Sequence, residues 1–219
     1  MVKPMDQRKQ HLETLSEIRS LMERSSRFIS LSGLSGVAAG VFALIGAAMV
    51  YVYLGISPFD QKHLYYTTLH SADRWGLDYR SFFLLDAGLV LISALGAGIL
   101  FTTRKARKKG QKIWDKTSQR LLINLLIPLA VGGLYCLLLI KHGALALVAP
   151  STLLFYGLAL VNASKYTLTD IRYLGFSEIA LGLIATYYVG YGLEFWAIGF
   201  GLMHIFYGTW MYFKYEAES

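Results

Sequence analysis

The chain has 219 residues, of which 55% are hydrophobic and 16% are charged, and its formal net charge is +7. A soluble domain carries roughly 25% charged residues, so this composition excludes an ordinary soluble globular protein. The hydrophobic residues collect in runs long enough to cross a hydrocarbon core of about 30 Å as helices. The composition is that of an integral membrane protein.

Residues 1–27 precede the first hydrophobic run and have an amphipathic pattern. Leu12, Leu15, Ile18 and Met22 recur at spacings of three and four residues, and charged residues of both signs occupy the other faces. This spacing predicts a cytoplasmic helix that lies on the inner membrane surface or against the cytoplasmic loops of the protein itself.

Six hydrophobic runs follow and together predict an all-α polytopic bundle of six transmembrane helices, arranged as three tandem hairpins. The predicted spans cover residues 28–54, 81–102, 121–140, 144–161, 174–190 and 195–213. They make up one transmembrane domain, residues 28–213, which is followed by a short cytoplasmic tail, residues 214–219.

The lysines and arginines predict the orientation of the bundle. Seventeen of them fall in the segments on the side of the two termini, and four fall on the opposite side. This bias is typical of a protein with both termini in the cytoplasm. The densest basic run, from Arg104 to Lys112, is expected to anchor the topology, and it could also attract anionic lipid headgroups. The positive net charge therefore requires no nucleic acid as a partner.

The outer segment between the first two spans raises the question of a metal site. His63 and His70 are seven residues apart, which is too far to share one ion on a single helix. His70 and Asp73 could both bind an ion, but two ligands make a weak site. We interpret this segment as an interfacial cap, with the metal site as the alternative, and we expect no cofactor.

Small residues predict where the helices pack. Gly36 and Gly40 lie on one ridge of the first span, and Gly201, His204 and Gly208 share one face of the last span. Helices in lipid associate through such small-residue faces because these let the backbones approach closely. We expect each face to pack on a helix of the same chain or of a second copy in a homo-oligomer.

Three ionisable residues lie within the predicted spans, at different depths. Asp86 is near the outer surface, His204 is central and Glu178 is nearer the cytoplasm. Such residues cost about 2.5–3.5 kcal/mol at a helix centre and often mark proton or cation paths. The estimated depths of Glu178 and His204 differ by about 7 Å, so we expect no direct contact between them.

A water molecule or a tyrosine hydroxyl, such as that of Tyr187 or Tyr207, could bridge that gap. The alternative interpretation is that Asp86, Glu178 and His204 make three separate structural contacts.

The last two hairpins contain a short repeat. Phe155-Tyr156-Gly157 belongs to the stretch that ends the fourth span, and Phe206-Tyr207-Gly208 belongs to the stretch that ends the sixth. With the glycine-rich stretches "SGLSGVAAGVFALIGA" and "LGFSEIALGLIATYYVGYGLEFWAIGFG", these triplets carry a resemblance to HdeD-type and other six-span bacterial inner-membrane proteins. The resemblance implies a bacterial inner membrane and an architecture of hairpins, and it implies no activity.

The sequence leaves two functions open and gives no catalytic motif. Phosphate loops, nucleophile elbows and zinc-binding helices are absent from the sequence, so no catalytic residue is assigned. The first hypothesis is proton-linked binding or transport of a small solute or ion through the bundle. The alternative is a non-transporting scaffold or sensor that acts through residues 1–27 and the basic inner loop.

Overall fold

A computed structural model of the chain describes residues 14–15, 31–58, 73–110 and 113–217. The amphipathic helix predicted for residues 1–27 falls outside the described residues, apart from Thr14 and Leu15, which are helical. His63 and His70 also lie outside them, so the metal alternative at His70 and Asp73 stays a prediction.

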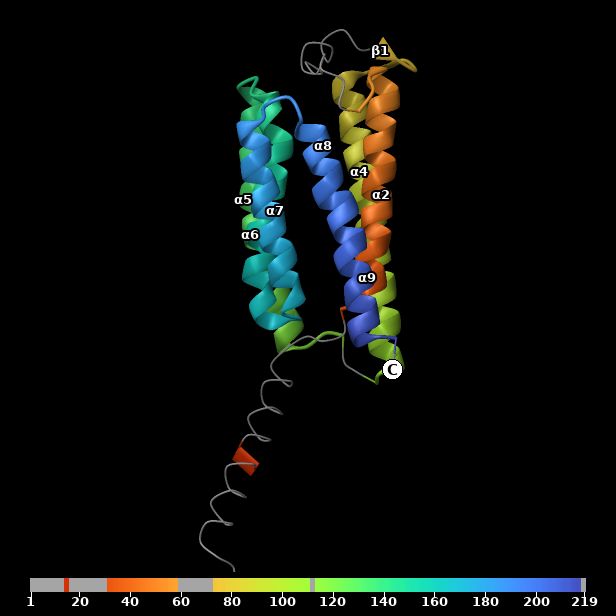
Figure 1. Cartoon of the computed structure of the whole chain (residues 1–219), viewed down its shortest axis with the longest axis vertical. Coiled ribbons are helices and arrows are strands. Elements are labelled where there is room, and N and C mark those ends of the chain that lie inside the picture. Colours follow the sequence, from red (N-terminus) through yellow and green to blue (C-terminus); the bar gives the residue numbers. More distant parts are fainter. Residues whose placement is uncertain (1–13, 16–30, 59–72, 111–112, 218–219) are drawn as a thin grey trace, which may run out of the picture.

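Helices dominate the described residues, as the all-α prediction required (Figure 1). The long helices are α2 (Gly33–Leu54), α4 (Tyr79–Lys108), α5 (Lys116–Lys141), α6 (Val148–Ala163) and α7 (Asp170–Tyr187). The chain then continues through α8 (Gly192–Trp196), the π-helix η3 (Ala197–Met203) and α9 (His204–Tyr215). The 3₁₀ turns η1 (Leu145–Leu147) and η2 (Ser164–Tyr166) flank α6, and the strands β1 (Asp73–Arg74) and β2 (Leu77–Asp78) form a two-residue antiparallel ladder.

Within the described residues, four helical segments are long and apolar enough to cross a membrane. They are α2, α4, α5 and the segment Leu145–Tyr166, which contains α6. The last two predicted spans coincide with α7 and with α8–η3–α9, but α7 carries three charged residues and η3 interrupts the other segment. The structure therefore has four clear candidate spans, and the arrangement of six spans stays a prediction.

The outer faces of these helices expose large apolar side chains. On α4, Leu84, Ile92 and Ile99 are 75%, 70% and 69% exposed. A soluble protein rarely exposes such a continuous apolar surface, whereas lipid covers it at no cost. The exposure pattern agrees with the composition in indicating a membrane protein.

The helices form two groups that meet at α8 and η3. In Figure 1, α5, α6 and α7 lie side by side, and α2 lies with α4 and α9 in a second group. α8 contacts α6 and α7, and η3 contacts both α2 and α7. The segment from α8 to α9 therefore joins the two groups.

Glycines set the close approach of α2 and α9. A Cβ atom built at Gly208 would lie 2.6 Å from the backbone nitrogen of Val37, and one at Gly36 would lie 3.2 Å from the Cα of Gly208. Gly40 faces Gly201 in the same way, because its Cβ would lie 2.6 Å from the Gly201 carbonyl oxygen. The two glycine faces expected from the sequence thus lie against one another within one chain.

A second glycine contact joins α6 to α7. A Cβ at Gly157 would lie 2.6 Å from the carbonyl oxygen of Gly175, and one at Gly175 would lie 2.8 Å from that of Gly157. Gly157 and Gly208 are the final residues of the two Phe-Tyr-Gly triplets. In both triplets the glycine lets its helix pack closely on a neighbour.

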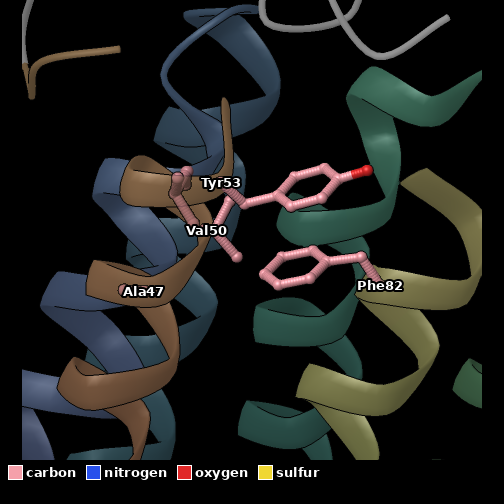
Figure 2. Packing of buried hydrophobic residues seen from close by; sticks show 5 residues of the cluster. Ala47, Val50, Tyr53 and Phe82 are labelled. Atoms are coloured by element: carbon pink, nitrogen blue, oxygen red, sulfur yellow. The ribbon is translucent and has the colours of Figure 1, made fainter. Parts of the chain in front are cut away.

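Aromatic residues pack α2 against α4 at the end of α2 (Figure 2). The rings of Tyr53 and Phe82 are stacked with their centroids 3.8 Å apart, beside Ala47 and Val50. The Tyr53 hydroxyl donates a hydrogen bond of 2.7 Å to the carbonyl oxygen of Leu77 in β2. Tyr53 therefore connects the small β-ladder to the helical core.

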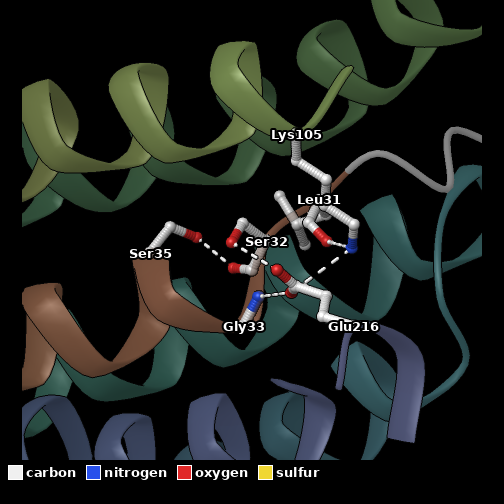
Figure 3. A network of polar contacts seen from close by, with 6 residues as sticks. All are labelled: Leu31, Ser32, Gly33, Ser35, Lys105 and Glu216. Carbon is white, nitrogen blue, oxygen red and sulfur yellow. Dashed lines mark hydrogen bonds and ion pairs between the residues drawn. The ribbon is translucent and has the colours of Figure 1, made fainter. Parts of the chain in front are cut away.

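A polar network closes the opposite end of the same helix (Figure 3). The Glu216 carboxylate accepts hydrogen bonds from the Gly33 backbone nitrogen at 2.6 Å and from the Ser32 hydroxyl at 3.1 Å. Lys105 lies 3.3 Å from the same carboxylate and donates to the Leu31 carbonyl oxygen. A carboxylate is stabilising there because the first amides of a helix lack backbone partners.

The burial of Lys105 corrects one expectation about the basic run from Arg104 to Lys112. Lys105 is 8% exposed because its ammonium group turns inward to Glu216 and Leu31. It is therefore not among the residues that could meet lipid headgroups, whereas Arg104, Arg107 and Lys108 are exposed.

Candidate functional site

A buried polar cluster lies where α6 and α7 meet the junction of η3 and α9. It consists of Tyr156 on α6, Glu178 on α7 and His204, the first residue of α9. The glycine contact between α6 and α7 brings Tyr156 and Glu178 near one another. His204 completes the cluster, because it directly follows η3 and lies beside Tyr156 and Glu178.

His204 contacts three groups through its two ring nitrogens. Its Nε2 lies 2.7 Å from the Tyr156 hydroxyl oxygen, and its Nδ1 lies 3.0 Å from the Gly199 carbonyl oxygen. The same Nδ1 is 3.5 Å from the Oε1 atom of Glu178. The imidazole ring therefore connects a tyrosine hydroxyl on one side to a carboxyl group on the other.

The partners of His204 define its hydrogen-bond directions. A carbonyl oxygen only accepts, so Nδ1 must carry a proton and donate it to Gly199. In the neutral ring Nε2 then accepts from the Tyr156 hydroxyl, and in the charged ring it donates to the same oxygen. Tyr156 can satisfy Nε2 in both states because a hydroxyl is both donor and acceptor.

Glu178 is the most completely buried ionisable residue of the cluster. Its side chain is 0% exposed, and neither carboxyl oxygen has a hydrogen-bond partner among the described residues. A lone carboxylate in such surroundings is strongly unfavourable. Together, Glu178 and His204 form a pair that is electrically neutral in two states. One is a carboxylic acid beside a neutral imidazole, and the other is a carboxylate beside an imidazolium.

Adding or removing one proton gives the pair an uncompensated buried charge. A neutral imidazole beside a carboxylate leaves a net charge of −1, and an imidazolium beside a carboxylic acid leaves +1. Glu178 and His204 are therefore electrically balanced when they share one proton between them.

Aromatic side chains cover the cluster on the side of η3. The Phe200 ring lies 5.9 Å from the His204 ring in a stacked orientation and 4.9 Å from the Tyr156 ring. Trp196 lies 5.1 Å from Phe200 and extends this cover. These rings limit the access of water to His204, which is 6% exposed.

Gly199 of η3 lies against the carboxyl group of Glu178. A Cβ atom at this position would lie 2.4 Å from Oε2 of Glu178. Only glycine leaves room for the carboxyl group in this place. π-Helical turns are rare in proteins, and those that occur are frequently found at functional sites. Here the turn contains Gly199, which leaves room for the Glu178 carboxyl group and whose carbonyl oxygen binds His204.

The contact between Glu178 and His204 corrects the expectation that they would not meet. That expectation placed Glu178 four residues inside a span starting at residue 174. In the structure α7 begins at Asp170, so Glu178 is eight residues into the helix, or about 12 Å. These four extra residues add about 6 Å to the depth of Glu178. α9 likewise continues to Tyr215, two residues past the predicted end, which adds about 3 Å to the depth of His204. The gap along the helix axes therefore shrinks from about 7 Å to about 4–5 Å, and the two side chains bridge it.

The bridging tyrosine differs from the predicted one. The Tyr207 hydroxyl lies 3.4 Å from the Ser177 hydroxyl and contacts neither member of the pair, whereas Tyr156 binds His204. Tyr187 is 81% exposed. Tyr156 and Tyr207 are the central residues of the repeated triplet, but the repeat does not indicate which of the two binds His204.

His204 also faces a different direction from the glycines of its helix. Gly201 and Gly208 lie against α2, but the His204 side chain turns toward α6 and α7. The predicted common face assumed a regular α-helix of 3.6 residues per turn. Gly201 lies within η3, whose turn is wider, so His204 does not keep the predicted register with Gly201. Gly208 lies four residues beyond His204 in the regular helix α9, so η3 does not change the register of these two residues.

Asp86 and Asp73 are not part of the cluster. Asp86 is half-buried on α4 and faces α2, where a Cβ at Gly46 would lie 3.3 Å from its Oδ2 atom. Asp73 lies in β1, opposite Asp78. No group of three potential metal-ligating side chains comes together within the described ranges.

A second buried carboxyl group, Glu194, was missed by the sequence analysis. It lies on α8, is 6% exposed and accepts a side-chain hydrogen bond from Tyr51 of α2. Residues 191–194 fall between two predicted spans, which predicts an outer turn. The structure places them inside, against α6 and α7.

Comparison of the chain with protein-family models, with curated proteins and with solved structures found no match. Function must therefore be inferred from the chemistry of the site and its place in the bundle.

Proposed function

We propose that this chain is a six-span protein of a bacterial inner membrane, with both termini in the cytoplasm, that binds one exchangeable proton at Glu178 and His204. In this proposal, proton binding is linked to the passage of a small solute or ion through the bundle. The observation that carries it is the fully buried Glu178 carboxyl group, 3.5 Å from the imidazole ring and without a hydrogen bond from the described residues.

The charge states of the pair support a role in proton exchange. A carboxyl group held only for structure would be expected to have its oxygens satisfied by donors, since an unsatisfied buried group costs about 1–3 kcal/mol or more. Here one bound proton keeps Glu178 and His204 electrically neutral. Removing it leaves a charge that a cation can neutralise or that favours a change in conformation.

Because Glu178 and His204 are buried, the structure corresponds in this proposal to an occluded state of transport, in which the site is closed to both sides of the membrane. Exchange of the proton then requires the side chains around Gly199 and Phe200 to move, because these residues cover the pair. Such steps are typical of transporters, in which a site near the middle of the membrane is opened to one side at a time.

Proton binding can be tested without knowledge of the solute. Infrared difference spectra of the purified protein between acidic and alkaline pH should contain a protonated carboxyl band that disappears in Glu178→Gln. His204→Gln should move the midpoint of that band along the pH axis. Tyr207→Phe is the matched control for Tyr156→Phe, because the two tyrosines occupy equivalent triplet positions and only Tyr156 binds His204.

Transport can be tested in proteoliposomes that contain a pH-sensitive dye and carry an imposed membrane potential. The wild-type protein should move protons, Glu178→Gln should abolish the flux and Tyr207→Phe should leave it unchanged. Equal flux in Glu178→Gln, or none in the wild type, would refute transport. An intact carboxyl band without flux would instead favour the alternative of a non-transporting sensor.

A further inference from the structure

A shallow groove of about 700 Å³ runs along one face of α4. The residues that line it follow the spacing of a single helical stripe, with steps of three and one. They are Gly96, Ile99, Leu100, Thr103, Arg104, Arg107 and Lys108. The stripe is apolar in its first half and polar and basic in its second.

The basic half of the groove has no counter-charge on its own helix. Arg107 and Lys108 follow Arg104 by three and four residues. The three side chains are therefore neighbours on the helix surface, and their positive charges repel one another. The sequence contains no aspartate or glutamate between Asp86 and Asp115. An anion bound between these three exposed side chains would remove that repulsion.

The chemistry of these side chains fits a phosphate group. Arginine presents a planar fork of donors that matches two phosphate oxygens, and lysine adds a further charge. Thr103 lies next to them in the groove and carries a hydroxyl donor. Lys105 does not contribute, because it is buried in the network with Glu216.

The apolar half of the groove indicates that the phosphate belongs to a lipid. Gly96 lines the groove and leaves open space beside the helix, since a Cβ atom there would meet nothing within 4 Å. Ile99 and Leu100 are 69% and 58% exposed beside it. From Gly96 to Lys108 the stripe is about 18 Å long, which exceeds the roughly 15 Å of one hydrocarbon leaflet and reaches the headgroup level.

We propose that this groove is a binding site for an anionic phospholipid, with the phosphate at Arg104, Arg107 and Lys108 and an acyl chain along Ile99, Leu100 and Gly96. The site depends on α4 spanning a membrane and not on proton binding by Glu178. Loss of proton binding would therefore leave it intact.

Native mass spectrometry of the full chain in detergent can measure the binding of phosphatidylglycerol against phosphatidylcholine with the same acyl chains. The triple variant Arg104→Gln, Arg107→Gln, Lys108→Gln should lower the preference for phosphatidylglycerol by roughly 100-fold, because each basic residue near the membrane surface contributes about fivefold.

The matched control removes the same charge elsewhere. Lys116, Arg120 and Arg172 are exposed at the same end of the bundle and lie outside the groove. Replacing all three by glutamine should change the preference less than about twofold, because they are not arranged around one phosphate. An equal loss in both triple variants would show non-specific attraction and overturn the site.

The apolar half has its own pair of variants. Gly96→Leu should fill the open space of the groove and weaken the binding of phosphatidylglycerol without changing any charge. Gly88→Leu is the control, because Gly88 is equally open on the same helix but does not line the groove. Equal effects of the two variants, or full competition by glycerol phosphate without acyl chains, would overturn the lipid assignment in favour of a free phosphate.

Discussion

Replacement of Glu216 should destabilise the fold more than loss of any exposed ion pair. The Lys105 and Glu216 side chains are only 7% and 12% exposed, and the carboxylate also accepts from Gly33 and Ser32. Removal of one partner from a buried pair costs about 3–5 kcal/mol, because the other charge stays buried without compensation. We expect this loss for Glu216→Ala. Glu216→Gln should lose about 2–3 kcal/mol, since its amide oxygen can still accept from Gly33.

Equilibrium unfolding in mixed micelles, followed by circular dichroism, can measure these losses. A double-mutant cycle with Lys105→Met isolates the pair, and we expect a coupling energy of about 1–3 kcal/mol. Lys108→Met is the control, because Lys108 is an exposed lysine one turn of α4 away. A loss below about 0.5 kcal/mol for Glu216→Gln, or strict additivity with Lys105→Met, would refute the reasoning.

Three further predictions concern the helix contacts and the site. Gly208→Leu should separate α9 from α2, because even a Cβ atom at this position would lie 2.6 Å from a backbone nitrogen of α2. Size-exclusion chromatography should then show aggregation, and a monodisperse variant would contradict this prediction. Gly199→Ala should displace the Glu178 carboxyl group, whose Oε2 lies 2.4 Å from the added carbon, and an unshifted infrared carboxyl band would contradict the packing. Asp170→Asn should cost less than about 1 kcal/mol, because Lys214 is 46% exposed. Lys214 lies outside the predicted spans, and its hydrogen bond with Asp170 raises its pKa. The stabilisation by this ion pair should therefore be complete below the ordinary lysine pKa of about 10.4 and disappear as the pH rises through the pKa of Lys214 in the folded protein. Unfolding measured at neutral and at alkaline pH tests whether stability falls in that direction.

The sequence predicted the helices well because length and apolar composition are local properties. It predicted their ends less well. α7 continues over Asp170 and Arg172, because backbone hydrogen bonds continue past the point where side chains become polar. That difference of one turn was enough to place Glu178 wrongly with respect to His204.

Residue spacing also identified packing faces better than packing partners. Gly36 and Gly208 were recognised as packing residues, but only the structure shows that they lie against each other. Tyr156 was missed for a related reason. A tyrosine in an apolar run has no local signal that distinguishes a hydroxyl bound to a histidine from one at a lipid surface, and the distinction comes from which helix lies beside it.

The π-helix η3 has a mechanical consequence for the bundle. It accommodates one residue more than an α-helix would over the same rise, and it separates α9, which is fixed to α2 through glycines, from α8, which contacts α6 and α7. A return of η3 to α-helical hydrogen bonding would turn α8 by about 100° and advance it by about 1.5 Å along the axis. This screw motion would carry Phe200 and Glu194 to new positions while α9 stayed in place. The π-helix thus sets the rotational register of α8 relative to α9.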